Sequence, residues 1–298
     1  MTADTILVPT DGSDVSESAA RRAFALAAQL DATVHLLGVV DTNVVAGGSY
    51  LGGSSHIRER LHEAANTWVG RLSADATDRG IEHVTAVETG VPAATIIDYA
   101  AEHGIDVIAM GTAGRGGVAR MVVGSVTDKV VRTAPVPVLT VNQRVLEATN
   151  DDAITSLLLP TDGSDPAEAA ARRGLDLAAR LGATVHILSA ADTDVAGGLL
   201  PLDDPDDITD QLLDRADDNC ASIATEAADR GLDVVTVTRE GTPAGEIVEY
   251  TADNDIDMIV MGTQGRGGFE RLVVGSVADS VVRKAPVPVM TVRPDGDR

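Results

Sequence analysis

The residues best suited to chemistry in this chain lie in a glycine-rich segment that occurs twice. Its spacing is G-x2-G-x9-G-S, and its residues in the two copies are Gly111, Gly114, Gly124 and Ser125, then Gly262, Gly265, Gly275 and Ser276. Glycine lets the backbone approach an anion closely and adopt positive φ. The last glycine and serine open a predicted helix, whose free N–H groups and dipole favour a phosphate. The segment therefore predicts a phosphate-binding loop in each copy.

Two better-known phosphate loops do not fit this segment. A Walker A loop is excluded because no Lys-Ser/Thr pair follows the glycines. A dinucleotide fingerprint fits the first copy only loosely and is broken by Glu270 in the second. Arg115 and Arg266 follow the second glycine of each copy, where an arginine either contacts phosphate or is solvated. Both interpretations stay open.

A second repeated motif follows the first apolar run of each copy. Pro9-Thr10-Asp11-Gly12-Ser13-Asp14 returns as Pro160-Thr161-Asp162-Gly163-Ser164-Asp165. An Asp-Gly-Ser turn often caps the next helix, so capping is the alternative role of Asp11. Because the turn follows the carboxyl end of a predicted strand, a nucleotide contact is favoured.

An internal repeat organises the whole chain. A shift of 151 residues aligns the two halves without a net gap, and 23 of 31 positions from Gly111 to Val141 are identical to Gly262–Val292. This period is too long for a solenoid and indicates a duplicated domain. The polar segment between the halves is the predicted linker, which gives domains at 1–143 and 154–298 and a linker at 144–153.

Apolar runs alternate with helical patterns in each half. Short buried-strand patterns and 3.6-residue periodicity together predict β-α-β-α-β-α-β-α-β, an α/β fold with a mostly parallel sheet. For the first half the predicted strands are Thr5–Val8, Val34–Val40, Val84–Val87, Val107–Met110 and Val136–Val141. The predicted helices are one capped by Ser13 or Asp14, then His56–Arg79, Ala93–His103 and Ser125–Arg132. Two prolines in the last strand favour a sheet edge, since proline removes a ladder donor.

The charge excludes some partners. The 298 residues carry 46 acidic and 23 basic side chains, a net charge of −23, with a mean hydropathy of +0.08. So negative a chain repels nucleic acid and anionic membranes. It predicts a protein adapted to a high-salt cytoplasm, where a Debye length of about 3 Å at 1 M salt screens self-repulsion. We see no signal-peptide pattern at the N-terminus and no apolar run of membrane-spanning length, so a cytoplasmic protein is expected.

The sequence pattern predicts structural roles for a cysteine and two histidines. Cys220 is the only cysteine and sits in a helical apolar pattern, which predicts a small buried hydrophobe. His35 and His186 occupy matching strand positions beside valines, where a histidine satisfied by an internal hydrogen bond is expected rather than a metal ligand.

On these motifs the sequence resembles the universal stress protein family in a tandem, UspA-like arrangement. The glycine spacing and the Pro-x-Asp at the end of the first strand resemble its ATP-binding branch. The resemblance implies two Rossmann-like domains of the adenine-nucleotide-α-hydrolase type, each with a five-stranded parallel sheet in the order 3-2-1-4-5. Strands one and four would then flank the switch point at which such sheets bind ligands.

The resemblance also implies roles for individual residues. Asp11, with the backbone of Pro9 and Thr10, would contact the adenosine, and the backbone of Val39 would contact adenine. The glycine loop would hold the ribose and phosphates. The second half supplies Pro160, Thr161 and Asp162, with Ala190 in place of Val39, so its pocket wall loses bulk.

Three functions remain open at this point. The first is a cytoplasmic stress-response module that binds ATP and Mg²⁺. The second is a slow ATP hydrolase, although Asp128 and Asp279, the matching carboxylates nearest the loop, lie a turn inside the following helix. The third is a nucleotide-free interaction scaffold. Family members pair through the fifth strand, so Val136–Val141 and Val287–Val292 are expected to pair within one chain, or between two chains of a homodimer.

Overall fold

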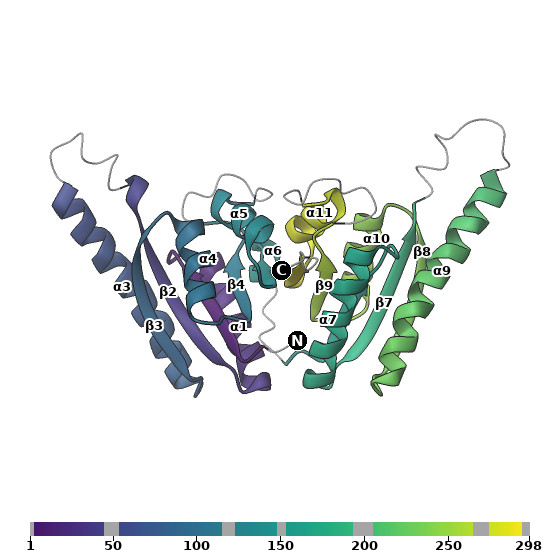
Figure 1. Cartoon of the computed structure of the whole chain (residues 1–298), viewed down its shortest axis with the longest axis horizontal. Helices are drawn as coiled ribbons and strands as arrows, with labels where there is room; N and C mark the ends of the chain where they lie inside the picture. The colour runs from purple at the N-terminus through teal and green to yellow at the C-terminus, as the bar shows by residue number, and fades with distance from the viewer. Residues whose placement is uncertain are drawn as a thin grey trace. The chain divides into compact units, whose positions relative to one another are not determined.

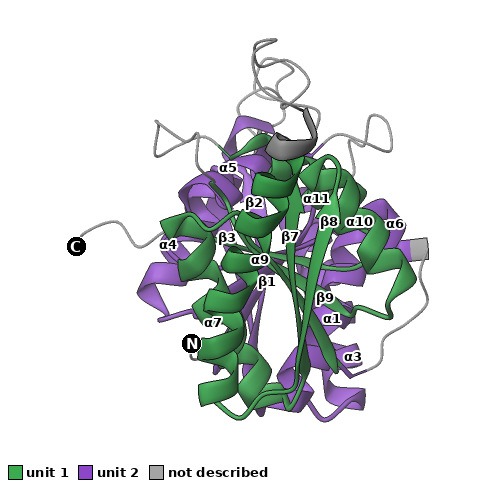
Figure 2. Cartoon of the chain, turned by 90° about the vertical axis from the view of Figure 1, so that its right-hand side faces the viewer, with its two compact units in different colours: residues 1, 154–298 green, residues 2–153 purple. Residues whose placement is uncertain are grey.

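The structure is a computed structural model that describes residues 3–44, 54–114, 123–147, 153–192, 205–264 and 274–293. It divides into two compact units, residues 2–153 and residues 154–298 with residue 1 (Figure 2). We call them the N-terminal and the C-terminal unit. Each is an α/β unit of parallel strands flanked by helices, the predicted class.

The N-terminal unit alternates strands and helices along the chain (Figure 1). Its elements are β1 (Thr5–Thr10), α1 (Asp14–Leu30), β2 (Thr33–Asp41), α3 (Ser54–Asp78), β3 (His83–Gly90), α4 (Pro92–Glu102), β4 (Val107–Gly111), α5 (Ser125–Thr133), β5 (Val138–Val141) and α6 (Gln143–Glu147). The strands lie in the order β3-β2-β1-β4-β5 and pair in parallel. The strands β2 and β3 lie on one side of β1 and the strands β4 and β5 on its other side, so the direction of strand addition reverses between β1 and β4.

The C-terminal unit repeats this organisation. Its elements are β6 (Ser156–Pro160), α7 (Asp165–Leu181), β7 (Thr184–Ala191), α9 (Pro205–Asp229), β8 (Val234–Glu240), α10 (Pro243–Asp253), β9 (Met258–Gly262), α11 (Ser276–Lys284) and β10 (Val289–Val292). Its strands lie in the order β10-β9-β6-β7-β8, which is the same order counted from the other end. The point of reversal therefore lies between β6 and β9.

The predicted strand order is confirmed within each unit, but the prediction of a separate five-stranded sheet in each half is not confirmed. The last strand of such an order keeps one side on which further strands can pair, so five strands do not by themselves complete a sheet.

The first helix shows how the sequence builds these units. Ser13 is the N-cap of α1, and its Oγ accepts a hydrogen bond from the backbone N–H of Ser16 at 3.3 Å. Two acidic residues in the first turn complement the helix dipole. The apolar stripe of α1, which includes Ala20, Ala23 and Leu26, is buried, and the helix packs against β1 and β4. Its small alanines let the helix lie close to the strands.

Most predicted boundaries differ from the observed ones by one to three residues, and two of the differences have a clear physical cause. β5 begins at Val138 instead of Val136, because Pro137 has no N–H to donate and contributes only its carbonyl, which accepts from Ile108 N at 3.0 Å. The predicted linker begins with the short helix α6, which is capped by Asn142. Val145 of α6 packs in a buried cluster with Ala19.

Among the described residues, no helix is both long enough and apolar enough to cross a membrane.

Candidate functional site

The switch point of the N-terminal unit opens at the carboxyl ends of β1 and β4. These strands pair only at Ile6 with Val107 and Leu7 with Ile108, whereas β1 stays paired with β2 up to Thr10 and Gly38. The last residues of β1 are thus not paired with β4. Loops that follow separating strands of this kind are where α/β proteins bind ligands.

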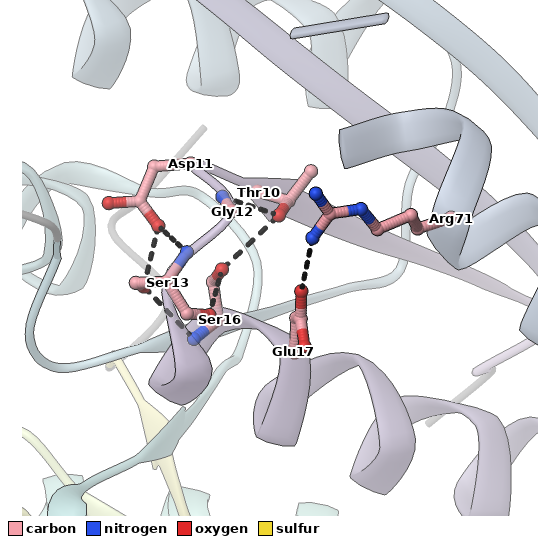
Figure 3. Close-up of polar contacts among 7 residues, drawn as sticks. All are labelled: Thr10, Asp11, Gly12, Ser13, Ser16, Glu17 and Arg71. Carbon is pink, nitrogen blue, oxygen red and sulfur yellow. Dashed lines mark hydrogen bonds and ion pairs between the residues drawn. The ribbon is translucent and has the colours of Figure 1, made fainter. Parts of the chain in front are cut away.

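The turn after β1 is held by a hydrogen-bond network (Figure 3). Asp11 Oδ1 accepts hydrogen bonds from Ser13 N at 3.1 Å and from Ser13 Oγ at 2.6 Å. Gly12 N donates to Thr10 Oγ1 at 3.1 Å, and Gly12 has a φ of +72°. The carboxylate of Asp11 is therefore fixed in orientation by the turn it belongs to.

The same network reaches the helix that follows. Ser16 Oγ donates to Ser13 O at 2.8 Å and lies 3.2 Å from Thr10 Oγ1 (Figure 3). Arg71 of α3 pairs with Glu17 of α1, with Nη1 and Oε1 3.7 Å apart. Strand, turn and both helices are thereby connected around Asp11.

The glycine loop meets this turn at Gly114. A β-carbon built on Gly114 would lie 2.6 Å from Asp11 Oδ2, which is closer than real β-carbons approach an oxygen. Gly111 is equally confined, since a β-carbon there would lie 2.9 Å from Val15 Cγ1 and 3.1 Å from Ser16 N. Larger residues at either position would push the loop away from Asp11.

The end of the glycine loop is tied back to its beginning. Gly124 N donates to Thr112 O at 2.6 Å, and Thr127 Oγ1 donates to Gly111 O at 2.7 Å. Gly124 is the N-cap of α5 and makes no side-chain capping hydrogen bond, while Ser125 is exposed. The amino end of α5 is thus beside the glycine loop and is not capped by its own N-cap residue.

The C-terminal unit builds the same turn and the same helix start. Asp162 Oδ1 accepts from Ser164 N at 3.1 Å and from Ser164 Oγ at 2.6 Å. Gly275 N donates to Thr263 O at 2.7 Å, and Gly275 caps α11 without a side-chain bond. A β-carbon on Gly262 would lie 3.0 Å from Pro166 O. The confined glycine is thus present in both units.

The other predicted site residues fall into two groups. Val39 and Ala190 lie half-buried near the carboxyl ends of β2 and β7, where they pair with Glu88 and Arg239. Pro9, Thr10, Pro160 and Thr161 are buried at the ends of β1 and β6. The prediction for Arg115, Gly265 and Arg266 lies outside the described residues.

The two carboxylates nearest the helix starts are engaged elsewhere. Asp128 pairs with Arg132 of the same helix at 2.9 Å, and Asp279 pairs with Arg283 at 2.8 Å. Each pair is more than a Coulomb attraction, because the guanidinium group also donates hydrogen bonds to the carboxylate. A carboxylate held in this way is a poor base for activating water.

The two strand histidines are satisfied, as predicted. His35 Nδ1 lies 3.0 Å from Tyr99 Oη, and His186 Nδ1 lies 2.7 Å from Tyr250 Oη. Burial lowers the pKa of both histidines, and nearby His103 lowers that of His35 further. Burial raises the pKa of Tyr99 and Tyr250. These pairs stay neutral near pH 7 and contribute to packing.

Cys220 is also structural, as predicted. Its side chain is 2% exposed, its Sγ lies 3.6 Å from Val237 O, and burial raises the pKa of its thiol. Within the described ranges, no three His, Cys, Asp or Glu side chains gather closely enough to hold a metal ion. A magnesium ion at this site would take most of its ligands from phosphate oxygens and water, its usual mode beside a nucleotide.

Sequence reasoning missed Trp68 of α3. A β-carbon on Gly12 would lie 2.4 Å from Trp68 Cδ1 and 2.5 Å from Nε1, so the indole occupies the space that glycine leaves open. The signal was present, since Trp68 is the single tryptophan of a chain with 2% aromatic residues. Nothing in its spacing linked it to a glycine on another element.

Comparison with known proteins gives one consistent result. The model of the universal stress protein family matches residues 2–142 and 154–293. The chain is 37% identical over 138 residues to a universal stress protein of Methanocaldococcus jannaschii, covering 46% of this chain and 81% of that one. It is 28% identical over 300 residues to one of Mycolicibacterium smegmatis, covering 97% of both.

A crystal structure of a universal stress protein from Archaeoglobus fulgidus has the same fold. Its TM-score against this chain is 0.73 at 21% identity, and the match covers 99% of this chain and 100% of that one.

Proposed function

This chain belongs to the universal stress protein family, and we propose that it is an ATP-binding module of the stress response, with one nucleotide site in each unit. Asp11, with the backbone of Pro9 and Thr10, would bind the adenosine, and the backbone of Val39 would face adenine. The glycine loop and the start of α5 would hold the ribose and phosphates. In the C-terminal unit the corresponding residues are Pro160, Thr161, Asp162, Ala190, Gly262, Gly265, Gly275 and Ser276.

The contact between Gly114 and Asp11 carries this proposal. It joins the turn after β1 to the loop after β4, so a ligand that touches both must span the switch point. One end of that span is a carboxylate, which accepts hydrogen bonds from ribose hydroxyls. The other end is glycine backbone and a helix amino terminus, which favour a phosphate. A nucleotide offers both groups at once.

The net charge of the chain opposes binding of the phosphates. A chain of charge −23 repels a nucleotide triphosphate over long distances. Local N–H groups and a magnesium ion on the phosphates would have to offset that repulsion. The metal supplies charge neutralisation of the triphosphate, and the chain supplies orientation.

Binding is favoured over hydrolysis by the state of the carboxylates. Asp128 and Asp279 are paired to arginines, and Asp11 Oδ1 is engaged by Ser13. A hydrolase needs a group that positions water at the γ-phosphate. A slow ATPase on the same sites is the second candidate, since the sites would hold the same substrate. A nucleotide-free scaffold is the third, and it leaves the confined glycines without a role.

We further propose that the protein is adapted to a high-salt cytoplasm, because its net charge is strongly negative.

We also propose that Val136–Val141 and Val287–Val292 pair with each other, either within one chain or between chains in a homodimer. Light scattering in molar KCl would separate these two forms by mass.

Calorimetric titration with Mg-ATP in molar KCl tests the central proposal. Two nucleotides bound per chain would support it, and an absence of binding would overturn it. Following the same sample for ADP separates the module from the hydrolase.

A further inference from the structure

Trp68 gives the N-terminal unit a feature that its counterpart lacks. Its indole lies on Gly12, in the middle of the turn that carries Asp11. The residue is half-buried, so part of it remains accessible to solvent. α3 is also tied to α1 by the pair between Arg71 and Glu17, which holds the helix carrying Trp68 against the turn.

An apolar cluster continues from Trp68 to the end of β2. Buried Val40 and Ala65 pack against partly buried Leu61, Trp68 and Val87. Val40 is the neighbour of Val39, at which the proposed site expects the base. An apolar, partly aromatic cluster therefore lies between α3 and β2, beside the backbone of Val39 at which the proposed site expects the base.

The C-terminal unit has a polar group in the same place. The 151-residue repeat puts Asn219 at the position of Trp68 and Thr238 at the position of Val87. Asn219 Nδ2 donates to Ser189 Oγ at 3.3 Å, and Thr238 Oγ1 donates to Asp217. These side chains satisfy one another and offer no flat apolar surface.

The residue before Val39 also differs between the two units. A β-carbon on Gly38 would lie 3.2 Å from both Ala65 Cβ and Val69 Cγ2. Ser189 holds the corresponding position in the C-terminal unit, where its hydroxyl bonds Asn219. In the N-terminal unit this position is therefore a glycine packed against α3, and in the C-terminal unit it is a serine bonded to Asn219.

Resting on the proposed nucleotide sites, we infer that Trp68 is the specificity-determining residue of the N-terminal site and makes the two sites unequal. Its indole forms a wall for a large flat base, and the N-terminal site binds ATP more tightly than the C-terminal site. Stacking of a base on an aromatic side chain corresponds to a difference in affinity of about tenfold. A ligand without a base gains nothing from this wall.

Tryptophan fluorescence of the full chain, measured beside calorimetry, tests this inference, because Trp68 is the only tryptophan. Mg-ATP is expected to change the emission over the concentration range of the tighter site only. Magnesium tripolyphosphate, which has no base, is expected to leave the emission unchanged. Emission that stays constant while the tighter site fills with ATP would overturn the inference.

Substitutions at Trp68 and at Asn219 complete the test. Trp68→Asn is expected to weaken the tighter site about tenfold, whereas Trp68→Phe keeps the aromatic wall and the affinity. Asn219→Trp adds the wall to the other unit without removing a packing contact from the first, and is expected to tighten the weaker site. Unchanged affinities in Asn219→Trp and in a folded Trp68→Asn would overturn the inference, while wild-type protein that binds no ATP would overturn the proposed function itself.

Discussion

Gly114 lies so close to Asp11 that a β-carbon on the glycine would stand 2.6 Å from Oδ2 of the carboxylate. The two residues follow different strands, β4 and β1, and the reversal of strand order between these strands brings them together. The turn and the glycine loop are therefore parts of one site, and a side chain at Gly114 would separate them.

Substitution of Gly114 by alanine should weaken ATP binding at the N-terminal site by about tenfold, a loss of about 1.4 kcal/mol. The added methyl group must displace the carboxylate that Ser13 holds in place. Because Gly114 is exposed, the melting temperature should change little. Calorimetric titration measures the affinity, and Gly70→Ala is the control, since a β-carbon on Gly70 meets nothing within 4 Å. Equal affinities in the two variants would contradict this prediction.

Gly12→Ala should destabilise the fold more than Gly80→Ala. Both glycines have positive φ, +72° and +69°, so both substitutions carry the same backbone strain of about 1–2 kcal/mol. Only at Gly12 does the new β-carbon overlap Trp68, and overpacking of this kind costs a further 1–3 kcal/mol or so. Urea denaturation of the two variants gives the difference directly. A smaller loss for Gly12→Ala than for Gly80→Ala would show that the indole is not packed on the turn.

Much of this architecture was predictable from the sequence because local signals agreed. The apolar stripe of α1, its Ser13 cap and the buried run of β1 each follow from periodicity and capping chemistry. Because the sequence repeats, each element predicted in the first half could also be predicted in the second half. Strands one and four were expected to flank the switch point, and Asp11 and Gly114, which follow these two strands, do lie close together.

The parts that could not be predicted depend on contacts between distant elements. No sequence pattern linked Trp68 to Gly12, and only the packing of α3 places the indole on that glycine. Helix α6 was missed because its five residues are too few for a periodic signal, and its stability depends on the cap at Asn142 and on Val145 in a buried cluster.

Stability should fall as the pH drops below about 6.5, the ordinary pKa of histidine. Burial lowers the folded-state pKa of His35 and His186, so the unfolded chain takes up protons first and gains stability relative to the fold. The contribution is complete above the unfolded pKa and is lost as the pH falls toward the lowered folded value. Melting temperatures between pH 7.5 and 5.5 measure this loss. The variant His35→Gln/His186→Gln should show a shallower dependence, and an unchanged slope would rule these histidines out as its source.

Potassium chloride should stabilise the chain. A net charge of −23 creates repulsion that extends about 10 Å at 0.1 M salt and about 3 Å at 1 M. Screening at molar salt should raise the melting temperature by more than about 4 °C, the shift that corresponds to about 1 kcal/mol in a domain of this size. Calorimetric scans at the two salt concentrations check this. A melting temperature independent of KCl would contradict the proposed salt adaptation.

Phosphate binding at the start of α5 is tested most directly by the number of nucleotides that the chain binds when this helix start is altered. A β-carbon on Gly124 would lie 3.4 Å from Thr112 O, an ordinary contact, so Gly124→Asp and Gly124→Asn both fit the fold. Aspartate places a negative charge where the phosphates are expected, and asparagine has the same shape without the charge. Titration with Mg-ATP in molar KCl should give two nucleotides per chain for the wild type and for Gly124→Asn, and one for Gly124→Asp. Two nucleotides in all three proteins would contradict this site, and none in the wild type would contradict nucleotide binding altogether.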